Sequence, residues 1–237
     1  MNVNGTATAR SPISSVAAVN AFLRSVYNWM GLGLGITALL AALFAYTDLR
    51  ALPLSPGGQT FGLVAMIAEV GLVFYLSLRI QKLAAGTAAG LFLLYSALNG
   101  FTLSFILMAY DQTAVAQAFI TAAGMFGAMS LYGLYTRKDL AGWGNLLFMG
   151  LIGLLIAMVV NIFLGSSLLG FGISVVGVII FLGLTAYDTQ LLKEMGQSVP
   201  YDDPAAVRRG AIIGALRLYL DFINLFLMLL RLIGDRR

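Results

Sequence analysis

The sequence predicts an all-α integral membrane protein, folded as a bundle of seven transmembrane helices. Of its 237 residues, 60% are hydrophobic and only 10% are charged, whereas about 25% of an ordinary soluble domain is charged. A spanning helix needs about 20 apolar residues, because the hydrocarbon core is about 30 Å thick and a helix rises about 1.5 Å per residue. Seven such helices and their loops use nearly the whole chain, so we expect no separate soluble domain.

The apolar segments define the spans in order along the chain. Prolines support the boundaries, because all five lie outside the apolar segments and proline breaks helices and favours turns. The predicted helices cover residues 26–47, 61–78, 83–109, 114–135, 143–164, 168–192 and 209–233. They are joined by a Pro/Gly turn at 48–60, basic connections at 79–82 and 136–139, turns at Asp111 and 165–167, and one long polar loop at 193–208.

The transmembrane domain is predicted to span residues 26–233, between an N-terminal tail at 1–25 and a C-terminal tail at 234–237. The first 25 residues are polar and lack the apolar region of a cleavable signal peptide. With the N-terminus in the cytoplasm, nine Lys and Arg residues lie on the inner side and four on the outer side. Positive charge gathers on the cytoplasmic side, so we expect that orientation. The short loops, and a C-terminal tail that is not rich in lysine, favour a bacterial inner-membrane protein over one of the eukaryotic endoplasmic reticulum.

The composition excludes several kinds of chemistry. The chain has no cysteine and no histidine, which excludes disulfides, thiolate nucleophiles, Cys/His zinc sites and Ser-His triads. Its three lysines lie at predicted loops or helix ends, so a retinal Schiff base within the bundle is not expected. The net charge of +4 is spread over loops and is not typical of nucleic-acid binding. We therefore expect neither an enzyme nor a resident cofactor. The 27 glycines favour close helix packing within a monomer in the lipid bilayer.

Charged residues inside the predicted spans are the candidate functional residues, because each buried charge in lipid costs about 2.5–3.5 kcal/mol. In the seventh helix Arg217, Asp221, Asn224 and Arg231 fall within an arc of about 80°, at about 100° per residue. Such a stripe must face other helices or water. An ion pair from Arg217 to Asp221, four residues apart, is the simpler structural interpretation, but it leaves the other polar residues unexplained.

Two more carboxylates lie within the spans. Glu69 lies in the second helix, and Asp188 lies about one turn inside the inner end of the sixth, if that helix ends near Lys193. Two carboxylates close together in a dry site cannot both ionise cheaply, so they share a proton. Asp188 and Asp221 are therefore a candidate pH-sensitive pair. An aspartyl protease dyad is the competing interpretation, but the segment TAYDTQ departs from the motif of that class.

Several segments resemble the Bax inhibitor-1 family of membrane proteins over nearly the whole chain. The most specific are LTAYDTQLLKEM in the sixth helix and LRLYLDFINLFLMLLRLIG in the seventh, and YNWMGLGLGITAL and LLYSALNGFTLSFIL match in character. The resemblance implies a seven-helix bundle in which the seventh helix is surrounded by the other six. It also implies a pH-sensitive calcium leak.

The resemblance assigns roles to five residues. Asp188 and Asp221 match an aspartate pair that senses pH, and Arg79 matches an arginine that interacts with this pair. Glu69 and Arg231 match a glutamate and an arginine nearer the outer side.

Calcium prefers six to eight oxygen ligands, so Asp188, Asp221 and Asn224 with backbone carbonyls would attract the ion without holding it, and weak binding permits passage. The alternative function is an interaction protein that modulates other membrane proteins, such as a quality-control protease, without transport of its own.

Overall fold

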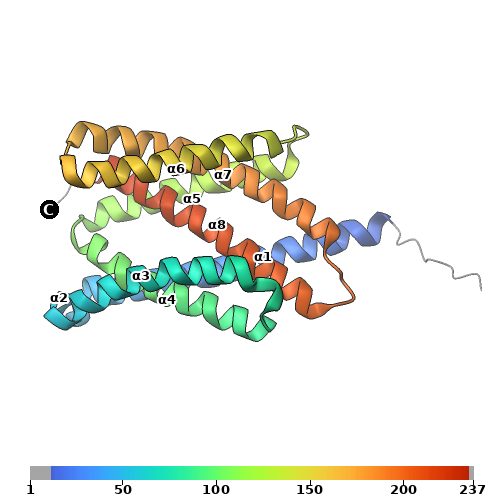
Figure 1. Cartoon of the computed structure of the whole chain (residues 1–237), viewed down its shortest axis with the longest axis horizontal. Coiled ribbons are helices and arrows are strands. Elements are labelled where there is room, and N and C mark those ends of the chain that lie inside the picture. The colour runs from blue at the N-terminus through green and yellow to red at the C-terminus, as the bar shows by residue number, and fades with distance from the viewer. Residues whose placement is uncertain (1–11, 235–237) are drawn as a thin grey trace, which may run out of the picture.

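The computed structural model describes residues 12–234, with side chains from Val16 onward, and this part of the chain is built from seven long helices (Figure 1). Each is long and apolar enough to cross a membrane. They are α1 (Pro12–Tyr46), α3 (Pro56–Arg79), α4 (Ala85–Met108), α5 (Gln112–Tyr135), α6 (Ala141–Leu164), α7 (Ser167–Ser198) and α8 (Pro204–Ile233). The short segments η1 (Asp48–Arg50), α2 (Ala51–Leu54) and η2 (Ile80–Lys82) connect the first spans. The predicted all-α architecture with seven spans is confirmed.

Helix α8 runs through the middle of the bundle. In Figure 1 it crosses between α6 and α7 on one side and α3 and α4 on the other. It packs against α1, α4, α5 and α7. In its most apolar window 72% of residues are buried, compared with 6% in α6. Asp221, in the middle of α8, is therefore surrounded by protein, where a partner or a polar cavity offsets its cost in lipid. The arginines of α8 are half-buried or exposed.

Polar residues fix where several spans begin. The side chains of Ser55, Asp111 and Ser166 accept hydrogen bonds from backbone amides in the first turns of α3, α5 and α7. These amides have no partner within the helix, so each cap stabilises its helix. Between α6 and α7 the chain turns at Gly165, whose φ of 60° is accessible to glycine at little cost.

The first helix begins earlier than the sequence predicted. Residues 12–25, expected to belong to a tail, form the first turns of α1. Phe22 is only 1% exposed, and its ring lies against Gly196 of α7 and Gly210 of α8. This apolar contact with α7 and α8 explains why the helix extends beyond the predicted boundary. Residues 1–11 and 235–237 of the predicted tails lie outside the described residues.

The long polar loop predicted at 193–208 is mostly helical as well. Helix α7 continues to Ser198 and α8 starts at Pro204, so only residues 199–203 connect them. The polar side chains of this region had suggested a loop. They are compatible with helices that extend past the hydrocarbon core, because α7 has 32 residues and a span needs about 20.

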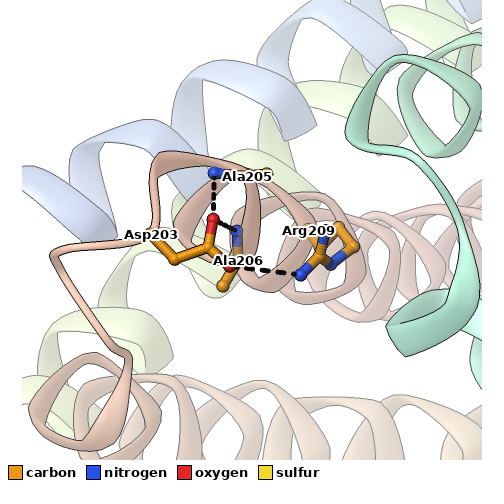
Figure 2. Close-up of polar contacts among 4 residues, drawn as sticks. All are labelled: Asp203, Ala205, Ala206 and Arg209. Carbon is orange, nitrogen blue, oxygen red and sulfur yellow. Dashed lines mark hydrogen bonds and ion pairs between the residues drawn. The ribbon is translucent and has the colours of Figure 1, made fainter.

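A carboxylate cap starts the central helix (Figure 2). Asp203 Oδ1 accepts hydrogen bonds from the backbone amides of Ala205 and Ala206, at 2.9 and 3.1 Å. Its Oδ2 lies 3.6 Å from Arg209 Nη2. Pro204 follows in the first helical position, where its missing N–H costs nothing. The sequence DDPAAVRR therefore encodes a strong helix start.

Candidate functional site: a polar groove beside the central helix

A groove of about 730 Å³ lies beside α8 and gathers most of the candidate residues. Its lining comes from α3, α4, α6, α7 and α8, and most of it is apolar. Five of its residues are the polar candidates singled out in the sequence: Glu69, Asp188, Arg217, Asp221 and Asn224. We call this cavity the central groove. Charged side chains from three helices thus line one cavity.

Asp188 is held by an arginine of the central helix. It is 7% exposed, and its Oδ1 lies 3.4 Å from Arg217 Nη1. The i, i+4 pair of Arg217 with Asp221, considered from the sequence, is not the ion pair that forms. Asp188 also lies farther from the end of its helix than expected, because α7 ends at Ser198, ten residues later, which is about 15 Å along the helix.

Asp221 lies in the same groove without a partner for one of its oxygens. The residue is 5% exposed, and among the described residues nothing hydrogen-bonds to its buried Oδ2. The charges of Asp188 and Arg217 both act on this carboxyl group. Two buried carboxylates and one guanidinium therefore share a site, with one negative charge more than the cation balances if both carboxylates ionise.

The other two arginines singled out in the sequence lie outside the central groove. Arg79 is exposed as the last residue of α3, and it has no hydrogen bond or ion pair with any described residue. Arg231 is exposed near the end of α8 and lines a separate cavity of about 310 Å³ with Tyr110. In this structure the cation beside Asp188 is Arg217.

Glu69 binds to helix α4 and not to an arginine. Its Oε2 accepts a hydrogen bond from Asn99 Nδ2 at 3.2 Å, and its Oε1 accepts one from Thr102 Oγ1 at 3.0 Å. Asn99 Oδ1 in turn accepts from the Tyr219 hydroxyl at 3.1 Å. Asn99, Thr102 and Tyr219 were not among the candidates predicted from the sequence, because they carry no charge. The signal for them in the sequence is an amide or hydroxyl side chain within a predicted span.

The groove offers oxygen atoms but no closed metal site. Asn224 Nδ2 donates to the carbonyl of Leu220 at 2.8 Å, and its Oδ1 makes no hydrogen bond with a described residue. Among the described residues, no three acidic side chains lie close enough together to hold a metal ion. Since calcium prefers six to eight oxygen ligands, such a groove can attract a divalent cation without binding it tightly.

Comparison with known proteins identifies the family. The sequence model of a family described as inhibitor of apoptosis-promoting Bax1 matches residues 19–237, which include the whole central groove. The inner membrane protein YbhL of Escherichia coli is 49% identical over 221 residues, covering 93% of this chain and 94% of that protein. Uncharacterized proteins of Deinococcus radiodurans and Borreliella burgdorferi are each 45% identical over 219 residues, covering 92% of this chain and 92% and 93% of those proteins. This chain is therefore a multi-pass integral membrane protein of the Bax inhibitor-1 family.

Proposed function

We propose that the protein is a pH-sensitive calcium leak whose ion passes through the central groove. The observation that carries this proposal is the buried Oδ2 of Asp221, which has no hydrogen-bond partner among the described residues, beside the Asp188–Arg217 ion pair. An excess negative charge in a bundle interior attracts cations and protons alike. Calcium is the transported ion, and no covalent chemistry or resident cofactor is involved.

The position of the pair along the helices supports a role in transit. Asp221 lies 17 residues after Pro204 and 12 residues before Ile233, or about 26 and 18 Å along the axis. Helix α8 is longer than the hydrocarbon core, which is about 30 Å thick. The position of Asp221, well inside both helix ends, therefore places a cation at this residue within the core. Asn224, one turn further along the same helix, adds a neutral oxygen ligand on the way.

Protonation supplies the gating in this proposal. When Asp188 and Asp221 are both ionised, Arg217 is attracted to both and holds α8 against α7. A proton taken up by the pair removes part of that attraction, so the two helices are free to shift at the inner mouth. The resemblance assigns the cation beside the pair to Arg79. We include Arg79 as a cation at the inner end of α3, and Arg217 as the direct partner of Asp188.

The direct experiment measures calcium flux into liposomes that contain only this protein, at several pH values. Three variants, Asp188→Asn, Asp221→Asn and the double substitution, remove the charges while keeping the side-chain size. Asp202→Asn is the matched control, because this exposed carboxylate lies in the α7–α8 connection, away from the groove. We expect pH-dependent flux in the wild type and the control, and pH-insensitive flux in the double variant. Unchanged pH dependence in the double variant would refute the sensor role.

One structural feature favours a second candidate function. Helices α1, α7 and α8 have 35, 32 and 30 residues, more than the about 20 that a span needs. Their extra turns meet around Phe22 at one end of the bundle, where they offer a folded surface to a partner. Absence of flux above that of empty liposomes at any pH would favour this role, in which the protein modulates another membrane protein.

The location of the protein follows from the same reasoning. The relative in Escherichia coli is called an inner membrane protein, and we propose a bacterial inner membrane for this chain also. Arg79, Lys82, Lys138 and Lys193 would then face the cytoplasm with the start of α1. We propose a monomer within the lipid bilayer and no role in nucleic-acid binding.

A further inference from the structure

A chain of hydrogen bonds links the central groove to three helices of the bundle. It starts at Glu69 on α3, which accepts from Asn99 Nδ2 on α4 at 3.2 Å. Asn99 Oδ1 accepts from the Tyr219 hydroxyl on α8 at 3.1 Å, and that hydroxyl lies 2.6 Å from Thr37 Oγ1 on α1. Thr37 donates to the carbonyl of Ser96 at 2.8 Å. Among the residues joined by these hydrogen bonds, only Glu69 changes its charge readily with pH.

The two hydroxyl groups of this hydrogen-bond chain, those of Thr37 and Tyr219, make more contacts with oxygen atoms than they have hydrogens to donate. Tyr219 approaches two oxygens, Asn99 Oδ1 and Thr37 Oγ1, and Thr37 also approaches the oxygen of Ser96. Three oxygen–oxygen contacts thus depend on two hydroxyl hydrogens, because each hydroxyl carries one. All these groups are buried or nearly so, and a buried contact without a hydrogen is unfavourable. When Glu69 is ionised, one of these three oxygen–oxygen contacts therefore has no hydrogen between its two atoms.

Protonation of Glu69 supplies the missing hydrogen if the side-chain amide of Asn99 flips, so that its oxygen and nitrogen exchange places. The protonated Glu69 Oε2 then donates to Asn99 Oδ1, and Asn99 Nδ2 donates to the Tyr219 hydroxyl. Tyr219 donates to Thr37, which donates to the carbonyl of Ser96. Every contact now has one hydrogen, and the heavy atoms keep their positions because the two ends of an amide are similar in shape. The only chemical change is one proton gained at Glu69.

We propose that Glu69, Asn99 and Tyr219 form a second proton-sensitive site, in which the Asn99 amide passes the protonation state of Glu69 to the central helix. Tyr219 is the receiving group on α8, and it is fully buried in edge-to-face contact with Phe92 and Tyr95. Asp221 follows it by two residues, so a change in the bonds that hold Tyr219 acts on the segment that carries the aspartate. Asn99 and Tyr219 are positioning residues here.

The electrostatic surroundings of Glu69 involve several helices. Its hydrogen-bond donors both come from α4, and the charges that share the groove come from α7 and α8. The titratable and charged groups around it are Tyr95, Tyr187, Asp188, Arg217, Tyr219 and Asp221. Because Asp188 and Asp221 also take up protons, the test has to follow Glu69 and Tyr219 individually.

Infrared difference spectroscopy at varied pH follows both groups in the full-length protein in lipid nanodiscs. Glu69→Gln identifies the carboxyl band of Glu69, and Tyr219→Phe identifies the phenol band of Tyr219. In the wild type we expect the two bands to change together, with the same midpoint. In Asn99→Leu the carboxyl band still changes, and the change in the phenol band is lost. A phenol band that does not change with pH in the wild type, or that still changes with pH in Asn99→Leu, would overturn the proposal.

Two further variants keep the test decisive. Thr102→Val removes the other donor to Glu69 but leaves the chain through Asn99 intact, so the two bands should still change together. Thr37→Val removes the acceptor that Tyr219 uses when Glu69 is protonated, so it should reduce the change in the phenol band. This variant replaces Asn99→Leu if the latter does not fold, and an unreduced change in it counts against the proposal.

The consequence for transport rests on the proposed function and is measured separately. Tyr219→Phe should change calcium flux at the pH of half-maximal wild-type flux by about fivefold, the effect of one hydrogen bond on an equilibrium. Unchanged flux in this variant, with coupled infrared bands, would refute the influence on the leak. A wild type without flux would refute the proposed function, while the infrared bands would still decide whether the relay exists.

Discussion

Substitution of Gly100 by alanine tests the packing on which the hydrogen-bond chain depends. Gly100 lies on α4 where this helix meets α1, and a Cβ atom there would be 2.8 Å from the carbonyl oxygen of Thr37 and 2.9 Å from Leu40 Cβ. Ordinary contact begins at 3.4 Å, so α1 must move away by roughly 0.6 Å. Backbone atoms cannot yield as a flexible side chain does, and overpacking of this kind costs about 1–3 kcal/mol.

Thermal unfolding of the purified protein in detergent measures this cost. The matched control is Gly90→Ala on the same helix, where a Cβ meets nothing within 4 Å. Alanine favours a helix over glycine by about 0.5–1 kcal/mol, so the control should keep or raise the unfolding temperature. Gly100→Ala gains the same helix propensity, so relative to the control it should unfold at a temperature lower by at least about 2–4 °C, the shift for about 1 kcal/mol. Equal unfolding temperatures for the two variants would refute the close approach of α1 and α4.

Three further predictions concern the charged residues. Arg217→Gln should raise calcium flux at neutral pH and change the pH midpoint of the flux by about one unit, or about 1.4 kcal/mol, because the cation beside Asp188 is lost. Arg79→Gln should have the smaller effect in the same liposome assay. A larger effect of Arg79→Gln would show that the Asp188–Asp221 pair interacts with Arg79. Arg231→Gln should leave the pH midpoint of flux unchanged, because this residue lines a separate cavity, and a shifted midpoint would contradict that separation. Asp203→Ala should reduce the free energy of unfolding by about 0.5–2 kcal/mol through loss of the helix cap, and an equal loss in Asp202→Ala would contradict the role of the cap.

The number and order of the spans were predictable because lipid imposes a simple rule on sequence. Each of the seven helices overlaps one of the predicted apolar segments. Errors occurred where helices continue beyond the apolar segments, at residues 12–25 and in the connection before α8. There the sequence is polar enough for water, and the helix is stabilised by contacts such as those of Phe22 with Gly196 and Gly210. Hydropathy alone does not reveal such contacts.

The candidate site was predictable in part. The period of a helix grouped Arg217, Asp221 and Asn224 on one face, and the structure finds all three in the central groove. The ion-pair partner of Arg217 was not predictable, because the sequence is compatible with an ion pair to Asp221, four residues later, and with one to Asp188 on α7. The choice depends on how α7 lies against α8, and the sequence contains no direct signal of that geometry.

By itself, the sequence determined that the chain spans a membrane seven times and that its few buried charges need a polar interior. Both conclusions follow from the cost of polar groups in lipid, which each segment shows separately. Only the tertiary structure decided which charges meet. It paired Asp188 with Arg217 and joined Glu69 to Tyr219 through Asn99. It also left Asp221 Oδ2 without a hydrogen-bond partner in the described part of the chain. These contacts connect residues up to 120 positions apart, and they depend on side-chain directions that are fixed only when the helices pack.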